Sequence, residues 1–250
     1  MIHPTAIVSD KAKLGKNISV GAYSIIYDNV ELGDNIEIEA FCEIGYSTKL
    51  AENMPLSIES GALIRSHSIL YQGSSFGENL TTGHRVTIRE KTKAGKNIQI
   101  GTLSDIQGDC IFGDYVRLHS NVHIGKTTQV GNYVWIFPYV VVTNDPHPPS
   151  NQLSGVIIKD FSIVATSSVL LPGVTIGFDA LVGAMSLVKK DVPDSVVVSG
   201  NPAEIVCSVE KIRNKFDRSK RVYPWRYYFE RGMPWEGMGY ENWLASLKKD

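Results

Sequence analysis

The sequence predicts an all-β fold in which the chain coils repeatedly and stacks on itself. From Phe76 to Val142, twelve successive positions recur at every sixth residue, and ten of them carry a sizeable apolar side chain. Glycine directly follows seven of these positions, and a small or branched residue usually stands four places after each. A period of six fits neither an amphipathic helix, with a period of about 3.6, nor a strand, with a period of about 2. It is typical of a chain that turns a corner every six residues.

The repeat begins at the N-terminus and sets the inward side chains of each short strand. Side chains two residues apart on a strand point to the same side, so each repeat position and the residue two before it should face the interior. We expect the glycines to lie at the corners, where the backbone conformation disfavours a Cβ atom. The first run of repeat positions is Ile2, Val8, Leu14, Val20, Ile26, Leu32, Ile38 and Ile44.

Two interruptions are expected in the coil. The six-residue frame slips by two between Ile44 and Ile58, which predicts a small bulging loop within Gly45–Ser57. A second loop follows Val142, near residues 144–156, where three of the four residues from Pro146 to Pro149 are proline. Because such a segment cannot form a central strand, we expect it to be extruded from the coil. The frame then resumes at Ile158, Val164, Leu170, Ile176, Val182 and Val188.

The coil should span residues 1–203, and residues 204–250 should form a separate C-terminal segment. A stack of coils needs a cap over its last face. Ile205, Val209, Ile212 and Phe216 recur at helical spacing, which predicts a capping helix within 204–220. The stretch from Tyr223 to Trp243 holds three of the four tryptophans. Such an aromatic tail either packs on its own rod or a neighbouring subunit, or lines the site of a flat ligand.

Composition excludes several functional classes. The net charge of −1 gives no support for nucleic-acid binding, and no run of 18 apolar residues predicts a membrane span. The N-terminus shows no secretory signal pattern. Three cysteines make no disulfide framework, and Cys42 and Cys110 fall on the small inward position of the repeat. We therefore expect a cytoplasmic protein.

The repeat [LIV]-G-x-x-[STAV]-x resembles that of the left-handed parallel β-helix, in which three hexapeptides form one triangular coil. The C-terminal coils also resemble hexapeptide acyltransferases, through Leu171–Gly177 (LPGVTIG), Val182–Ala184, Val188–Pro193 and Val198–Ala203. The loop Asn144–Pro149 and the tail motifs Tyr223–Arg226 and Arg231–Trp235 are similar to N-acyltransferases that act on dTDP-linked 3-amino-3,6-dideoxyhexoses.

This resemblance implies an acetyl-CoA-dependent N-acetyltransferase of a nucleotide-linked amino sugar, used for surface-polysaccharide or glycan biosynthesis. It also implies a homotrimer of parallel rods, with the active site between adjacent subunits. Acyl-CoA would lie along the groove between the C-terminal coils, and the nucleotide sugar would enter from the other end of the cleft. No metal is expected.

The reaction would be aminolysis of a thioester, which needs a neutral amine and stabilisation of an oxyanion. A sugar amine beside electron-withdrawing oxygens should be less basic than lysine, so a strong protein base is not essential. We predict that Asn144 and Asp145 orient the amine, and we count both and His123 as catalytic candidates. The candidates for substrate binding are outward-facing residues of the middle coils and of the loop: His84, His119, Asn121 and His147.

The candidates for CoA binding lie at the C-terminal end of the coil. Gly183 and Ala184 would offer backbone groups to the pantetheine arm. The CoA phosphates and adenine would meet two lysines and the turn that follows them, namely Lys189, Lys190, Gly200, Asn201 and Pro202.

Three other readings of the sequence stay open. His84, His119 and His123 raise the possibility of a zinc γ-type carbonic anhydrase, although the last two have three residues between them where that family has four. O-acetylation of a sugar is a second alternative. A non-catalytic hexapeptide scaffold is the third.

Overall fold

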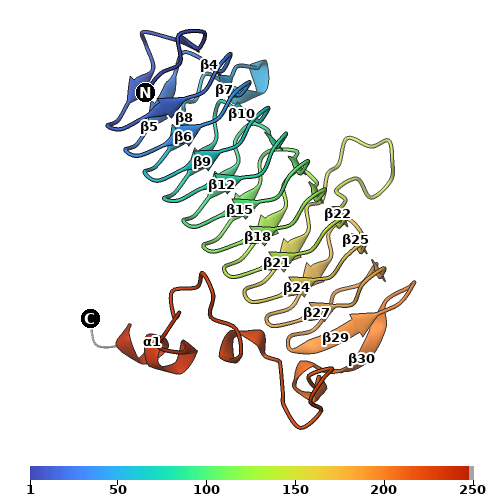
Figure 1. The fold of residues 1–250 in the computed structure, drawn as a ribbon. Coiled ribbons are helices and arrows are strands. Elements are labelled where there is room, and N and C mark those ends of the chain that lie inside the picture. Colours follow the sequence, from blue (N-terminus) through green and yellow to red (C-terminus); the bar gives the residue numbers. More distant parts are fainter. Residues whose placement is uncertain (248–250) are drawn as a thin grey trace.

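The computed structural model describes residues 1–247 and shows a parallel β-helix of hexapeptide coils with a C-terminal tail (Figure 1). The predicted all-β coil is confirmed. Each coil contributes one short strand to each of three sheets, which we call sheets I, II and III in the order in which the chain visits them.

Sheet I has ten strands: β1 (Ile7–Val8), β4 (Ile25–Ile26), β7 (Glu43–Tyr46), β10 (Ile69–Tyr71), β13 (Thr87–Ile88), β16 (Asp105–Ile106), β19 (His123–Ile124), β22 (Val141–Val142), β25 (Val169–Leu170) and β28 (Leu187–Val188). Sheet II has nine strands: β2 (Lys13–Leu14), β5 (Val30–Leu32), β8 (Leu56–Ile58), β11 (Ser75–Phe76), β14 (Lys93–Ala94), β17 (Ile111–Phe112), β20 (Gln129–Val130), β23 (Ile157–Ile158) and β26 (Thr175–Ile176).

Sheet III has eleven strands: β3 (Ser19–Val20), β6 (Glu37–Ile38), β9 (Leu63–Ile64), β12 (Thr81–Thr82), β15 (Gln99–Ile100), β18 (Arg117–Leu118), β21 (Trp135–Ile136), β24 (Ile163–Val164), β27 (Leu181–Val182), β29 (Val196–Ser199) and β30 (Glu204–Ser208). The corners are named after the sheets that they join: I–II, II–III and III–I.

The interior of the rod is a column of apolar side chains in register. Successive strands of a sheet pair in parallel, so that Ile106 stands beside Ile124, and Ile124 beside Val142. The repeat position and the residue two before it are both buried, as Ile124 and Val122 show. Cys42 and Cys110 occupy this small inward position and are fully buried, as predicted. Burial of this column is the main source of stability, because removing apolar surface from water drives folding.

The glycines that follow the repeat positions do not have the role at the corners that the sequence suggested. The left-handed backbone falls two residues after them, for example at Asn97 (φ 57°) after Gly95 and at Leu103 (φ 61°) after Gly101. Gly101 instead faces the next coil, where an added Cβ would lie 2.4 Å from the carbonyl carbon of His119. Glycine is therefore selected for close approach between stacked coils, and the expectation of positive φ at these glycines was wrong.

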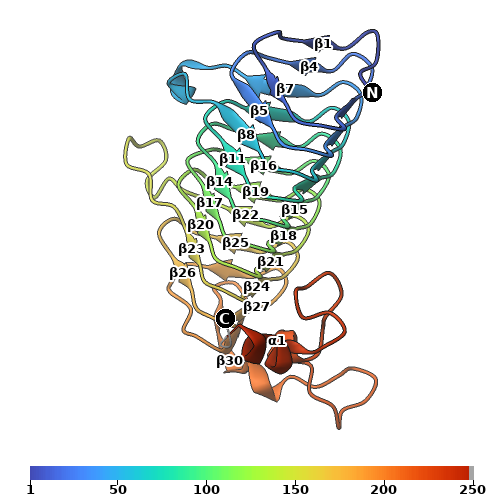
Figure 2. The same cartoon turned by 90° about the vertical axis from the view of Figure 1, so that its left-hand side faces the viewer.

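Both predicted interruptions leave the rod at corner I–II. The first contains the short 3-10 helix η1 (Lys49–Ala51), and the second runs from β22 to β23. The second loop projects visibly from the rod, on the side opposite the C-terminal tail (Figure 2). The frame resumes at β23 as expected.

The C-terminal segment differs from the predicted capping helix. Glu204–Ser208 forms β30, which pairs antiparallel with β29 and closes the end of sheet III. The 3-10 helix η2 (Val209–Lys211) follows, and the apolar side chains of Ile205 and Phe216 are exposed. The prediction of a helix from this spacing failed because the edge of β29 was free to pair. As a strand, β30 forms hydrogen bonds with the backbone groups that β29 would otherwise leave unpaired.

The aromatic tail packs on its own rod, which was the first of the two expectations. It contains the 3-10 helix η3 (Trp225–Tyr227) and the helix α1 (Tyr240–Ser246). Trp235 is fully buried, and its indole Nε1 donates to the Phe229 carbonyl oxygen at 2.9 Å. The tail and the rod share one hydrophobic cluster, whose buried members are Phe161, Ile163, Trp225, Met233 and Trp235.

Arg226 anchors the tail to corner II–III. Its guanidinium is buried and paired with Asp179, and it lies 5.0 Å from the centre of the Phe161 ring.

Within residues 1–247, no helix is long and apolar enough to cross a bilayer.

Candidate active site

The predicted site residues fall into three regions of the rod. His123 lies on the outer face of sheet I, and the loop residues Asn144, Asp145 and His147 lie at corner I–II beside it. The second region is corner III–I of the middle coils, with His84, His119 and Asn121. The third region is the C-terminal end of the rod, which holds the CoA-binding candidates.

His123 is oriented by a carboxylate from the preceding coil. Its Nδ1 lies 3.1 Å from Asp105 Oδ2, and the Gln107 amide donates to the same carboxylate oxygen at 2.5 Å. Asp105 and His123 are register partners on β16 and β19, so their side chains leave the sheet side by side. The imidazole and the carboxylate are 41% and 37% exposed, and the pair is therefore open to a ligand.

The carboxylate of this pair is held in its ionised form. Burial works to raise the pKa of Asp105, but hydrogen bonds from His123 and Gln107 outweigh it, and the pKa of this carboxyl is lowered. An ionised Asp105 holds the Nδ1 proton of His123, which leaves Nε2 able to accept a proton. A histidine oriented by a carboxylate is the usual arrangement of a general base.

Asp105 and Gln107 were missed by the sequence analysis. The signal was present, because Asp105 stands 18 residues before His123, which is the length of one coil in this register. Lys126 and Asp109, further along corner I–II, form an ion pair at 2.9 Å and connect the same two coils.

The loop at corner I–II is built around Asp145. Its carboxylate accepts from the Ser150 backbone N–H at 2.9 Å, from the Ser150 hydroxyl at 2.8 Å and from the His147 backbone N–H at 3.1 Å. The Ser150 hydroxyl is the main cause of the lowered pKa of Asp145. Asp145 therefore fixes the loop conformation, and the His147 side chain is exposed.

Asn144 lies where the loop leaves the rod, two residues after the end of β22. Its Cβ lies 3.1 Å from the point where a Cβ on Gly125 would be, two residues after His123 in sequence. The structure thus brings Asn144 to the same corner as the strand that carries His123.

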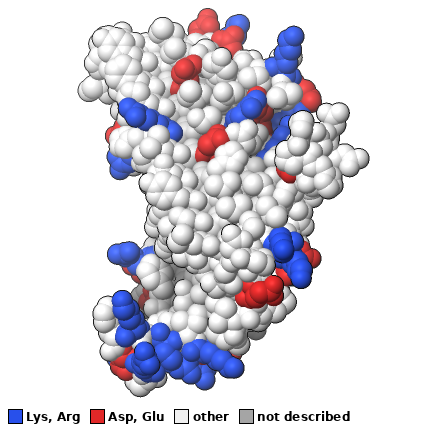
Figure 3. Space-filling model, turned by 90° about the vertical axis from the view of Figure 1, so that its right-hand side faces the viewer, with Lys and Arg blue, Asp and Glu red and all other residues white. Residues whose placement is uncertain are grey.

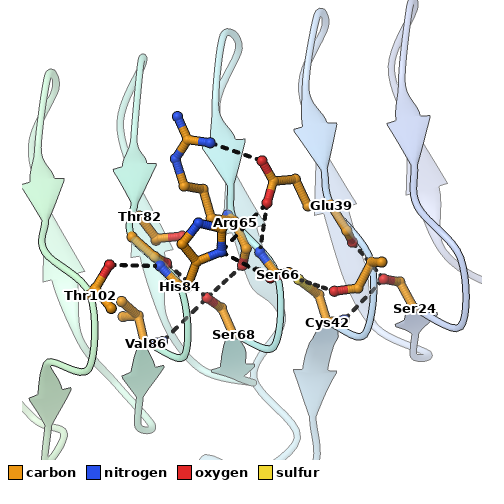
Figure 4. Close-up of polar contacts among 12 residues, drawn as sticks. Ser24, Glu39, Cys42, Arg65, Ser66, Ser68, Thr82, His84, Val86 and Thr102 are labelled. Atoms are coloured by element: carbon orange, nitrogen blue, oxygen red, sulfur yellow. Dashed lines mark hydrogen bonds and ion pairs between the residues drawn. The ribbon is translucent and has the colours of Figure 1, made fainter.

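His84 belongs to a polar ladder that runs along corner III–I (Figure 4). Its Nδ1 lies 2.9 Å from the Ser66 hydroxyl and 3.7 Å from a Glu39 carboxylate oxygen. Arg65 pairs with the same Glu39 at 2.9 Å. These contacts join three successive coils, so His84 has a structural role at this corner.

His119 lies two coils further along corner III–I. Its ring stacks on Phe137 with centroids 4.6 Å apart, and burial lowers the pKa of the imidazole. The neutral form is therefore favoured. Asn121 takes the left-handed corner conformation, which asparagine tolerates better than most residues.

A cavity of about 540 Å³ opens beside His119 on the outer face of sheet III. We call it the arginine cavity, because Arg65, Arg117 and Arg231 all line it. None of these arginines was singled out from the sequence. They lie far apart in the chain, and only the docking of the tail brings Arg231 next to the rod.

The CoA-binding candidates form no single cluster. Gly183 and Ala184 lie at corner III–I, whereas the exposed Lys189 and Lys190 follow β28 at corner I–II. The exposed turn Gly200-Asn201-Pro202 closes onto β28, because the Leu187 N–H donates to the Gly200 carbonyl oxygen at 2.9 Å. Lys and Arg side chains also gather at the end of the rod where residues 209–222 lie (Figure 3).

The three histidines of the zinc alternative do not converge in one protomer. Each has its own partner: Ser66 for His84, Phe137 for His119 and Asp105 for His123. In the part of the chain that the structure describes, no three His, Cys, Asp or Glu side chains are arranged to hold a metal ion.

The chain is similar in sequence to several known acyltransferases. No protein-family model matches the chain. It is 32% identical to the galactoside O-acetyltransferase of Lactococcus lactis over 137 residues, which cover 51% of this chain and 61% of that protein. It is 35% identical to the acyl-[acyl-carrier-protein]–UDP-N-acetylglucosamine O-acyltransferase of Burkholderia orbicola over 126 residues, which cover 50% of this chain and 42% of the relative.

Among solved structures, the Arabidopsis UDP-N-acetylglucosamine acyltransferase matches with a TM-score of 0.61 and 21% identity, over 100% of this chain and 90% of that one. This likeness shows the fold, which is consistent with the left-handed β-helix expected from the hexapeptide motifs. The sequence matches span about half of the present chain and less than two thirds of these two relatives. The activity of the chain is therefore a separate question.

Proposed function

We propose that this protein is an acetyl-CoA-dependent N-acetyltransferase that acts on the amino group of a nucleotide-linked hexose. The observation that carries the proposal is the His123–Asp105 pair on an open face of a middle coil, with Nδ1 to Oδ2 at 3.1 Å. The related sequences support the acyl-transfer class, since they include acyltransferases of a galactoside and of UDP-N-acetylglucosamine. The loop and tail motifs favour a dTDP-3-amino-3,6-dideoxyhexose as the acceptor.

The proposed reaction transfers an acetyl group from sulfur to nitrogen. The sugar amine attacks the thioester carbonyl, a C–N bond forms, and the carbonyl oxygen becomes an oxyanion. The C–S bond then breaks, and CoA leaves as a thiol while the nitrogen loses a proton. His123 Nε2 would take up that proton, Asp105 would stabilise the resulting imidazolium, and the imidazolium would then pass the proton to the departing sulfur to give the thiol.

The loop and the C-terminal coils would bind the two substrates. Asn144, at the same corner as His123, would orient the amine through its side-chain amide. Asp145 would act by holding the loop in place, since both of its carboxylate oxygens accept hydrogen bonds within the loop. Acetyl-CoA would lie along the C-terminal coils near Gly183 and Lys189, in a groove completed by the next subunit of a homotrimer.

Sugar O-acetylation is the second candidate, because both of the sequence relatives described above are O-acyltransferases. The same residues would serve it, with His123 removing the proton from a hydroxyl. A hydroxyl has a much greater need of a base than a neutral amine has, so loss of His123 should be more damaging for an O-acetyltransferase.

Thiol release from acetyl-CoA against a small acceptor panel tests the proposal. The panel holds dTDP-3-amino-3,6-dideoxyglucose, its galacto epimer, the 4-amino analogue, a UDP-amino sugar and a free galactoside. We expect turnover of one 3-amino dTDP-sugar and little with the galactoside. Turnover of the galactoside alone would establish O-acetylation instead. If no acceptor is turned over and CoA does not bind, the result would favour the non-catalytic scaffold.

A further inference from the structure

The arginine cavity lies between sheet III and the tail, and its lining contains none of the residues given a role in the proposed acetyl transfer. Its floor is a row of outward side chains in register: Thr81, Gln99, Arg117 and Trp135. Adjacent strands are about 4.8 Å apart, so these four strands span about 14 Å. The volume of about 540 Å³ lies within the range of small-molecule sites, about 300–1,000 Å³.

Arg117 in this floor is a buried charge without a counter-charge. The residue is only 9% exposed, and its Nε has no hydrogen-bond partner among the described residues. Its one hydrogen bond is from Nη2 to the Gly232 carbonyl oxygen at 2.9 Å, and it enters no ion pair with any residue of the described chain. Because a guanidinium stays charged in proteins, this site lacks an anion.

A second cation faces the same space. Arg231 is exposed on the tail and lies 5.8 Å from the centre of the Phe229 ring, and no carboxylate within residues 1–247 pairs with it. Arg65, at the far side, is already matched by Glu39. The cavity therefore holds two uncompensated guanidinium groups, and guanidinium geometry suits the bidentate recognition of phosphate.

An aromatic cavity of about 450 Å³ adjoins it and shares Trp135 and Phe229 as walls. These two rings meet edge to face with centroids 5.4 Å apart. The Trp135 indole Nε1 is buried and has no hydrogen-bond partner within residues 1–247. A flat ring would fill this space and stack against these aromatic walls, as bases do against aromatic side chains.

We infer that the two adjoining cavities form a binding site for a nucleoside diphosphate, with the diphosphate on Arg117 and Arg231 and the base against Trp135 and Phe229. Two ligands of the proposed reaction carry this chemistry, the nucleotide sugar and CoA. The inference rests on the proposed function only for the identity of these two candidate ligands. The site itself is defined by its charge and its aromatic walls.

The test measures binding by calorimetry with the full chain and three ligands: dTDP, UDP and CoA. The variants are Arg117→Gln and Arg231→Gln, with Arg218→Gln as the matched control because Arg218 is also an exposed tail arginine but lies outside the cavity. We expect dTDP to bind the unmodified protein and each cavity variant to weaken it by about 10- to 100-fold, as for loss of one charge-assisted phosphate contact. Arg218→Gln should leave binding unchanged.

The ligand series distinguishes the two sources of the diphosphate. Weakened dTDP with unchanged CoA assigns the site to the nucleotide sugar, and the reverse assigns it to CoA. Unchanged binding of all three ligands in both cavity variants overturns the inference, as does the absence of binding to the unmodified protein. Arg117 is buried, so its substitution could disturb the fold, whereas Arg231 is exposed and its substitution should not. Thermal melting of both variants checks that they are folded.

Turnover separates this inference from the proposed function. If the site binds dTDP through Arg117 but no acceptor is acetylated, the nucleotide site stands and the acetyltransferase proposal fails. If an amino sugar is acetylated with kcat and KM that do not change in Arg117→Gln, the function stands and the nucleotide site fails.

Discussion

The His123–Asp105 pair gives the sharpest prediction for the chemistry. In Asp105→Asn the imidazole loses the carboxylate that orients it, while the shape of the side chain is kept. A hydrogen bond to a charged group contributes about 1.5–3 kcal/mol when buried. The imidazole here is 41% exposed and the carboxylate 37%, so we take about 1–2 kcal/mol. At about 1.4 kcal/mol for each factor of ten, kcat should fall about 5- to 30-fold.

Removal of the His123 imidazole should lower kcat more than Asp105→Asn does. His123→Ala should lower kcat by about 10²- to 10⁴-fold if His123 acts as the general base. Because Asp105 acts only through His123, adding Asp105→Asn to His123→Ala should lower kcat no further. Asp109→Asn is the matched control: Asp109 is 37% exposed and paired with Lys126 at 2.9 Å in the same region, so its loss should change kcat less than about 2-fold.

The pH dependence follows from the sign of the Asp105 shift. Its pKa lies below the ordinary value of 3.8, so the carboxylate stays ionised through neutral pH and the stability that it contributes is lost only as pH falls through that lowered pKa. In Asp105→Asn this carboxylate is absent, so the part of the stability that depends on its ionisation should no longer change with pH. Denaturant unfolding at a series of pH values, from about 7 down to below the usual Asp pKa of about 3.9, measures this effect in the unmodified protein and in Asp105→Asn. Equal loss of stability in the two proteins at acid pH would contradict it. An unchanged kcat in His123→Ala would refute the base role.

Three further predictions concern the loop, the tail and the cysteines. Asn144→Ala and Asp145→Ala should each lower kcat with little change in CoA affinity by calorimetry; unchanged kinetics in both would remove the loop from the mechanism. Trp235→Ala should destabilise the tail by about 3–5 kcal/mol, because the ring is fully buried; limited proteolysis should then cleave the tail while the rod resists, and equal resistance to that of the unmodified protein would contradict the packing. Burial raises the pKa of Cys110 to about 11, so a thiol reagent at pH 8 should leave it unmodified in the folded protein, while the partly exposed Cys207 is the site expected to react; rapid labelling of Cys110, detected by peptide mass, would show that the coil opens.

The fold could be predicted from the sequence because each coil repeats the same physical demands. The inward residues, such as Ile124 and Val122, follow from the six-residue period alone. The corner glycines were correctly located but wrongly explained. Gly101 is required because an added Cβ would lie 2.4 Å from the His119 carbonyl carbon of the neighbouring coil, not because of its own backbone angle. The capping helix was wrong, because a helical spacing of four apolar residues cannot reveal that the edge of β29 is open to pairing.

The candidate site was harder to predict because its partners come from different coils. Asp105 could have been found from its 18-residue offset to His123, once the coil length was applied to polar outward residues. The arginine cavity could not, because Arg117 and Arg231 are 114 residues apart and meet only through the docking of an irregular tail. Periodicity predicts contacts within the rod, but it carries no information on where a non-repeating segment packs.

The central claim is that acetyl transfer ends on nitrogen, and the nature of the product tests it most directly. The protein is incubated with acetyl-CoA and dTDP-3-amino-3,6-dideoxyhexose, and the product is analysed by mass spectrometry before and after treatment with hydroxylamine. The account predicts a gain of one acetyl group that survives the treatment, as an amide does. An acetyl group that hydroxylamine removes would be an ester, and it would contradict the account.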